Sequence, residues 1–141
     1  MKVIVVSGAH SNVGKTQLAK ALCALLPGAV RIKIGHRARK PGEDNYLYEI
    51  GTGFSKIAAE HAGAPFLVIE SNRILEEITP ECAIYLTGKD PKPSAGIAIK
   101  KADIIRGQVV PSEKVSILVK RLECDEGVVR KIIELSGALT E

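Results

Sequence analysis

Short apolar runs alternate with segments of helical periodicity along the chain. The runs that predict buried strands are 2–7, 29–34, 65–71, 81–88 and 103–110. They are largely apolar and rich in β-branched residues, which is typical of strands covered on both faces. The pattern therefore predicts a three-layer α/β fold, with a mainly parallel sheet and helices on both of its faces.

Helical periodicity marks most of the segments between these runs. Residues 15–26 place Leu18, Leu22, Leu25 and Leu26 on one face before a Pro-Gly pair ends the helix. Further helices are predicted at 45–51, 72–78 and 94–102, and two C-terminal helices are predicted with Ser112 and Asp125 as N-caps. Because the carboxyl ends of parallel strands share one edge, the loops that follow them should form a single crevice.

The composition indicates how many domains the chain forms and in which compartment it lies. The 141 residues are 45% hydrophobic and 26% charged, without a repeat or linker, so one domain over residues 1–141 is expected. No apolar run reaches the roughly 18 residues that a membrane span needs, and no secretory signal is visible. Three scattered cysteines are typical of a reducing compartment. We expect a cytoplasmic protein without membrane contact.

The excess of positive charge is local. The net charge is +4, and much of the excess lies within residues 31–42. With three tyrosines, two phenylalanines and no tryptophan, the chain lacks an aromatic platform for stacking bases. The basic segment therefore favours a small anionic ligand over a nucleic acid.

The segment GAHSNVGKT, residues 8–16, is typical of a phosphate-binding loop (P-loop) between a strand and a helix. Five residues separate Gly8 from Gly14, one more than usual, and Ala9 stands where the first glycine is expected. Alanine is small enough for close approach to a phosphate. Lys15 should bridge the β- and γ-phosphates of a nucleoside triphosphate, and the Thr16 hydroxyl should bind Mg²⁺.

The residues predicted to contact the nucleotide in this segment are Gly8, Ala9, His10, Ser11, Asn12, Val13, Gly14, Lys15, Thr16 and Gln17. An ordinary strand-to-helix turn with an exposed lysine is the alternative.

Acidic residues are expected to complete the site. Glu70 ends a predicted strand, where a carboxylate can bind Mg²⁺ together with Thr16 or order the attacking water. Asp44 and Glu43 are further candidates. The predicted catalytic residues are Lys15, Glu70 and Asp44, and the predicted metal ligands are Thr16 and Glu70. A surface ion pair for Glu70 and a plain helix cap for Asp44 remain open.

Two other segments indicate which second substrate and which nucleotide base the site could bind. His36, with Arg37, Arg39 and Lys40, is predicted to hold phosphates of a second substrate, or to form a solvated loop. TGKD, residues 87–90, is similar to a guanine-binding element in which Lys89 covers the base and Asp90 accepts its protons, although Gly88 and Lys89 are transposed. A simple turn explains the same residues.

Together these motifs resemble the molybdopterin-guanine dinucleotide biosynthesis protein B family of P-loop NTPases. The resemblance rests on GAHSNVGKT, on Glu70 in PFLVIES, and on Lys33, His36, Pro41, Gly42, Asp44, Tyr46 and Gly51. It covers residues 1–71 well. Ala9, Gln17 and Ser71 depart from the glycine, threonine and glycine of the family pattern.

The resemblance implies a homodimer that binds GTP and Mg²⁺ with weak hydrolysis. It implies a partner nucleotidyltransferase that attaches GMP to molybdopterin. A small-molecule kinase and a non-catalytic nucleotide-dependent binding module, using ATP or GTP, are the alternatives.

Overall fold

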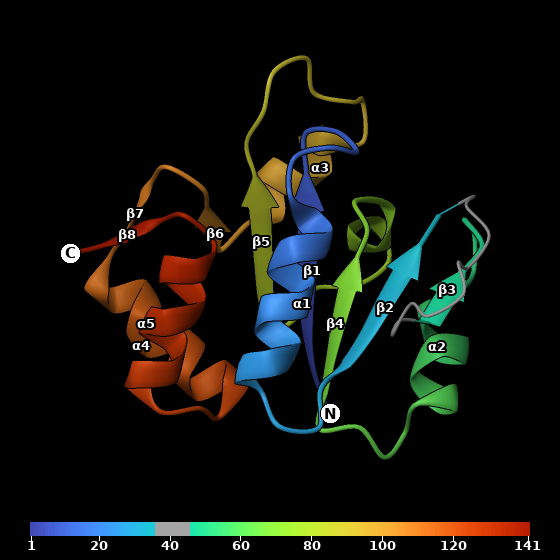
Figure 1. The fold of residues 1–141 in the computed structure, drawn as a ribbon, viewed down its shortest axis with the longest axis horizontal. Helices are drawn as coiled ribbons and strands as arrows, with labels where there is room; N and C mark the ends of the chain where they lie inside the picture. Colours follow the sequence, from blue (N-terminus) through green and yellow to red (C-terminus); the bar gives the residue numbers. More distant parts are fainter. Residues whose placement is uncertain (36–45) are drawn as a thin grey trace.

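A six-stranded parallel sheet forms the centre of the fold (Figure 1). The computed structural model describes residues 1–35 and 46–141. The strand order is β3-β2-β4-β1-β5-β6. The strands are β1 (Lys2–Gly8), β2 (Val30–Ile34), β3 (Tyr46–Tyr48), β4 (Phe66–Glu70), β5 (Cys82–Leu86) and β6 (Ile104–Ile105). The predicted α/β fold with a parallel sheet is confirmed.

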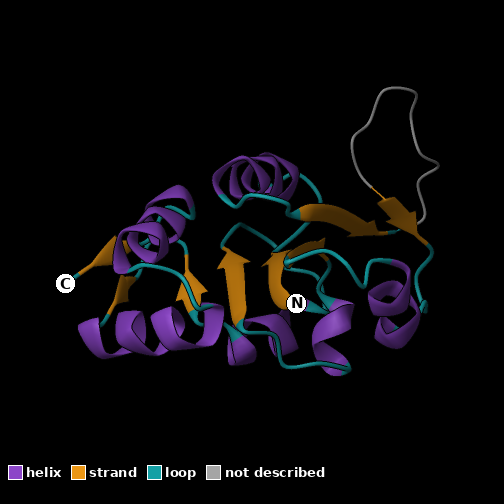
Figure 2. Cartoon of the chain, turned by 90° about the horizontal axis from the view of Figure 1, so that it is seen from below, coloured by secondary structure: helices purple, strands orange, loops and turns teal. Residues whose placement is uncertain are grey.

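Helices lie on both faces of this sheet (Figure 2). One core joins Ile4 and Val6 of β1 to α1 (Lys15–Leu25), α4 (Ser112–Leu122) and α5 (Glu126–Leu135). The other core joins Val3 and Val5 to α2 (Phe54–Glu60), the 3₁₀ helix η1 (Arg73–Glu76) and α3 (Ala95–Lys101). Because alternate side chains of β1 enter opposite cores, the strand is apolar at every position from Val3 to Val6.

The strand register brings the candidate site to one edge. Val6 of β1 is paired with Glu70 of β4, and Glu70 is paired with Lys33 of β2. On the other side of β1, Gly8 is paired with Leu86, the last residue of β5. The P-loop, Glu70 and the 87–90 turn therefore follow neighbouring strands at the carboxyl edge of the sheet.

Two predicted elements differ from the structure in the first two thirds of the chain. Residues 46–48 of the predicted 45–51 helix form the edge strand β3, where Tyr46 is paired with Ile32. The Tyr-Leu-Tyr sequence suits a strand because aromatic side chains pack well on a pleated surface. The predicted 72–78 helix forms only the 3₁₀ helix η1. Asp44, its proposed N-cap role included, lies outside the described residues.

The predicted 103–110 strand is split in two. Gly107 has φ 86°, a left-handed conformation that interrupts an extended strand. Residues before it form β6, whereas β7 (Val109–Val110) pairs with β8 (Leu139–Thr140) in a separate two-stranded sheet. The single-strand prediction was therefore wrong.

The two C-terminal helices are confirmed. Val115, Leu118 and Leu122 of α4 are buried, as the apolar periodicity predicted. Asp125 occupies the N-cap position of α5. The N-cap of α4 is Pro111 rather than the predicted Ser112, because Ser112 already lies in the helix. Among the residues that the structure describes, no helix has the length and apolarity required to cross a membrane.

Candidate functional site

The P-loop connects β1 to α1, and in the described part of the chain the backbone amide groups at the N-terminus of α1 are left without a side-chain cap. Gly14 is the N-cap of α1 with φ 105°, a conformation that glycine adopts without strain. Within the described residues, no side chain caps the amide groups of this helix end. Uncapped amide groups and the helix dipole favour an anion at this position.

The unusual glycine spacing has a steric explanation. A Cβ atom on Gly8 would lie 2.9 Å from Cγ1 of Val13, so the loop closes on itself at Gly8. Ala9 is fully buried, and its methyl group packs beside Gly88. The alanine side chain therefore fills the space between the P-loop and the 87–90 turn, which explains a small residue at position 9.

Asn72, directly beyond β4, fastens the start of the P-loop. Its Oδ1 accepts a hydrogen bond from the Gly8 backbone N–H (2.9 Å), and its Nδ2 donates to the Gly8 carbonyl (2.8 Å). Nδ2 also donates to Ser94 Oγ (3.2 Å). The sequence predicts that residue 72 lies at this edge but not that Asn72 binds Gly8 and Ser94, because these partners are 64 and 22 residues away.

Thr16 and Glu70, the predicted metal ligands, lie together. The Thr16 hydroxyl donates a hydrogen bond to Glu70 Oε1 at 2.7 Å. Glu70 is buried, and its Oε2 forms an ion pair with Arg31 at 3.4 Å. A hydroxyl and a carboxylate are oxygen ligands of the kind that Mg²⁺ binds. The surface ion pair considered for Glu70 is instead a buried pair.

Lys15 lies in a positively charged setting. Burial is the main cause that lowers the pKa of the Lys15 ammonium below its usual value. The positive charges of Lys92 and Lys33 lower this pKa further, whereas the Glu70 carboxylate raises it. An anion beside Lys15 would relieve both the burial cost and the repulsion between these lysines.

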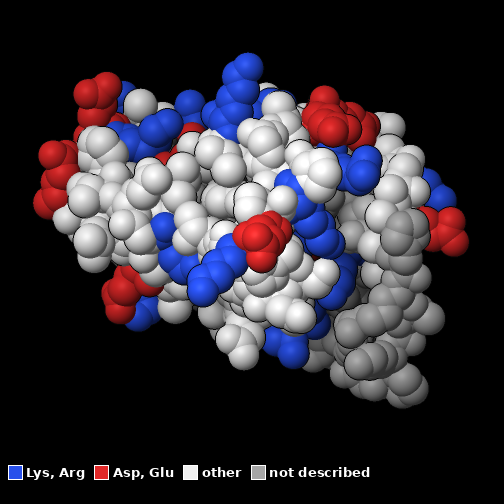
Figure 3. Space-filling model, turned by 90° about the horizontal axis from the view of Figure 1, so that it is seen from above, with Lys and Arg blue, Asp and Glu red and all other residues white. Residues whose placement is uncertain are grey.

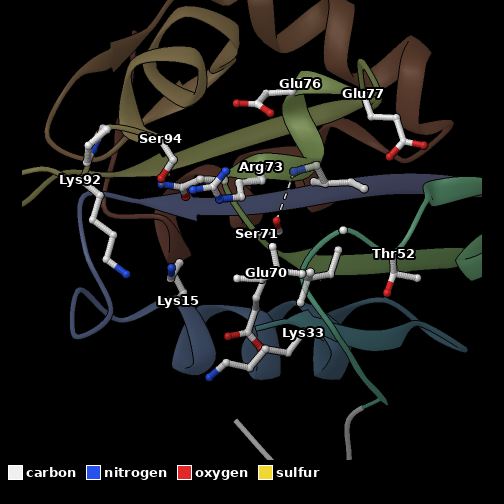
Figure 4. A pocket seen from close by; sticks show the side chains of 16 residues that line it. Lys15, Lys33, Thr52, Glu70, Ser71, Arg73, Glu76, Glu77, Lys92 and Ser94 are labelled. Carbon is white, nitrogen blue, oxygen red and sulfur yellow. Dashed lines mark hydrogen bonds between the residues drawn. The ribbon is translucent and has the colours of Figure 1, made fainter. Parts of the chain in front are cut away.

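A cavity of about 790 Å³ adjoins the P-loop (Figure 4). Lys15 and Glu70 line it together with Lys33 of β2, which follows from the strand register. Further lining residues come from the end of β4, from η1 and from the 92–94 segment: Ser71, Asn72, Arg73, Glu76, Glu77, Lys92 and Ser94. Seen onto the carboxyl ends of the strands, Lys and Arg side chains extend across the middle of the surface (Figure 3).

The 87–90 turn lies against the P-loop. A Cβ atom on Gly88 would lie 2.9 Å from His10 Nε2 and 3.2 Å from the Ala9 Cβ. Glycine at position 88 therefore allows the two loops to touch, which explains the transposed Gly88 and Lys89. Lys89 and Asp90 are exposed, and Asp90 has φ 51°.

Arg106, just beyond β6, joins three segments at the same edge. One guanidinium nitrogen donates to the Val13 carbonyl at 2.9 Å, and the other donates to the Thr87 carbonyl. The aliphatic part of Arg106 passes over Gly137, where a Cβ would lie 2.9 Å from its Cγ. Arg106 was not predicted, because both hydrogen-bond acceptors are backbone atoms of distant segments.

The remaining predicted residues are distributed as follows. Ser11 and Asn12 are exposed in the P-loop, and Gln17 is exposed on α1. The remaining residues predicted for phosphate or metal binding lie outside the described part of the chain: His36, Arg37, Arg39, Lys40, Glu43 and Asp44.

The described part of the chain offers no other cluster of metal-binding side chains. Within residues 1–35 and 46–141, no group of three or more His, Cys, Asp or Glu side chains is arranged to hold a metal ion. The Thr16–Glu70 pair therefore stays the candidate metal position in the described part of the chain.

Comparison with curated proteins finds one relevant similarity. The chain is 32% identical over 99 residues to the ATP-dependent dethiobiotin synthetase BioD of Saccharopolyspora erythraea. The aligned part is 70% of this chain but only 40% of the relative. No protein-family model matches the chain, and no solved structure matches it. The sheet, the loop and this similarity together identify an α/β protein with the P-loop nucleotide-binding fold, distantly similar to dethiobiotin synthetase.

Proposed function

We propose that the protein binds a nucleoside triphosphate with Mg²⁺ at the P-loop and transfers its terminal phosphate to a small anionic acceptor in the adjoining cavity. One observation carries this proposal: Lys15 of the P-loop and Glu70, which is hydrogen-bonded to Thr16, line the same cavity. A volume of about 790 Å³ is within the range of small-molecule sites. The similarity to a protein named as ATP-dependent supports ATP as the nucleotide.

The residues of the P-loop have separate roles in this proposal. The open end of α1 and Lys15 bind the phosphates. Thr16 and Glu70 bind Mg²⁺, which supplies charge neutralisation at the phosphates when it is bound. The Thr16 hydroxyl oxygen and the Glu70 carboxylate, which is paired with Arg31, would hold the metal ion when it is bound.

The cavity wall carries four cationic side chains (Lys15, Lys33, Arg73 and Lys92) and three carboxylates (Glu70, Glu76 and Glu77), and this excess of positive charge supports an anionic acceptor. Lys33 lies beside Glu70 through the β2–β4 register, and Arg73 lines the same space from η1. If the acceptor carries a carboxylate or phosphate group between these cations and Lys15, their positive charges balance its negative charge. In this proposal the acceptor lies within reach of the terminal phosphate, as catalysis by positioning requires.

Titration of the protein with a fluorescent ATP analogue, with and without Mg²⁺, tests the nucleotide part. Lys15→Ala should weaken binding by about a hundredfold, because a charge-assisted contact of about 3 kcal/mol is lost. Lys20→Ala, an exposed lysine on the same helix, is the matched control. Equal affinities of wild type and Lys15→Ala would argue against the proposal.

A GTP-binding accessory protein is the second candidate. In that role the protein, as a homodimer, hydrolyses GTP weakly and assists a nucleotidyltransferase that attaches GMP to molybdopterin. The exposed Lys89 and Asp90 support it, since their turn touches the P-loop at His10. GTP should then compete better than ATP, and Asp90→Asn should remove that preference. Preference for ATP in both proteins would exclude this candidate.

A further inference from the structure

Lys92 is attached to the P-loop by both its backbone and its side chain. Its backbone N–H donates to the Ala9 carbonyl at 2.8 Å. Its ammonium donates to Ser11 Oγ at 3.2 Å. Pro91 and Pro93 flank it; each has a fixed φ of its own, and Pro93 also restricts the backbone of Lys92, the residue before it. The position of Lys92 beside the P-loop is therefore held by the loop that follows β5.

The side chains of Lys92 and Lys15 reach the same space from two different loops. Both lysines line the cavity beside the P-loop, the charge of Lys92 acts on Lys15, and Figure 4 shows the Lys92 side chain extending toward the side of the cavity where Lys15 lies. In the described part of the chain, neither forms an ion pair with a carboxylate. Two neighbouring ammonium groups repel unless an anion lies between them.

We propose that Lys92 is a second phosphate ligand, contributed by the loop after β5, whose ammonium binds the terminal phosphate of the nucleotide opposite Lys15. This inference rests on the proposed function. The contact with the neutral Ser11 hydroxyl is weak enough to be exchanged for a charged phosphate oxygen. Since the backbone of Lys92 is already held at Ala9, little conformational entropy is lost on binding.

The transfer step needs no proton from either lysine. An acceptor oxygen forms a bond to the γ-phosphorus, and the bond from this phosphorus to the bridging oxygen breaks. The electron pair of the broken bond stays on the β-phosphate of the diphosphate product. Lys92 and Lys15 stabilise the negative charge that is spread over the terminal phosphate during the transfer.

The test compares a triphosphate with a diphosphate in calorimetric titrations with Mg²⁺. The probes are adenylyl imidodiphosphate, a slowly hydrolysed ATP analogue, and ADP. Lys92→Gln should weaken binding of the analogue by about tenfold to a hundredfold, and binding of ADP by less than about threefold. Lys92→Arg keeps the charge and should retain most of the affinity. Lys100→Gln, an exposed lysine on α3, should change neither.

The outcomes separate this inference from the proposed function. If Lys15→Ala abolishes binding but Lys92→Gln binds both probes like wild type, the role of Lys92 is refuted and the proposed function stands. An equal loss for both probes also overturns it, since Lys92 then does not act on the terminal phosphate. If wild type binds neither probe, the proposed function itself fails.

Discussion

Replacing Asn72 by alanine removes both hydrogen bonds that hold the first residue of the P-loop to the end of β4. The Gly8 N–H and carbonyl lose partners at 2.9 and 2.8 Å. Both residues are buried, so each backbone group left without a partner costs about 1–3 kcal/mol. Partial access of water reduces the sum, and we expect the free energy of unfolding to fall by about 2–4 kcal/mol.

Urea denaturation followed by circular dichroism measures this loss. With a slope of about 2 kcal/mol per molar urea, the midpoint should fall by about 1–2 M at unchanged slope. Asn72→Asp keeps the acceptor for the Gly8 N–H but places a carboxylate oxygen against the Gly8 carbonyl, so it should also destabilise. Asn12→Ala, at an exposed position of the same loop, should change the free energy by less than about 0.5 kcal/mol. A loss below that value for Asn72→Ala would refute the reasoning.

Three further predictions concern single residues. Gly14→Ala places a side chain at φ 105°, so stability should fall by about 1–2 kcal/mol in thermal unfolding; an unchanged melting temperature would contradict this. Thr16→Val removes the hydroxyl that bonds Glu70, and nucleotide affinity should lose its dependence on Mg²⁺, whereas Thr16→Ser should keep it. Burial and the hydrogen bond to Glu60 raise the pKa of Tyr48 to about 12. Its stabilising contribution is thus complete below the unfolded pKa of about 10 and is lost as pH rises toward 12; absorbance at 295 nm should show this late titration, and Tyr48→Phe should remove it.

The sheet could be predicted because its central strands are apolar on both faces. The runs that became β1, β4 and β5 needed no knowledge of distant contacts. The edge strands were less predictable, since β3 is three residues long and Gly107 divides the run at 103–110. A short aromatic segment is compatible with a helix or a strand, and only pairing with β2 decides between them.

The P-loop and the Thr16–Glu70 pair could also be found from sequence. A strand, a glycine-rich loop and a helix follow one another locally, and parallel strands bring a strand-end carboxylate to the same edge. The contacts of Asn72 and Arg106 could not be predicted, because both side chains bind backbone atoms, which every residue has and which leave no signal in the sequence. Lys92 lies in the 87–92 segment that the sequence places at this edge, but no role was predicted for it, because only Lys89 and Asp90 match a known pattern.

The central claim is that the P-loop binds a nucleoside triphosphate through Lys15. Equilibrium binding of ATP and GTP with Mg²⁺, measured side by side on wild type and Lys15→Ala, tests it most directly. We expect saturable binding of at least one nucleotide by wild type and about a hundredfold weaker binding by Lys15→Ala. Failure of wild type to bind either nucleotide, or equal affinity of the two proteins, would contradict the account.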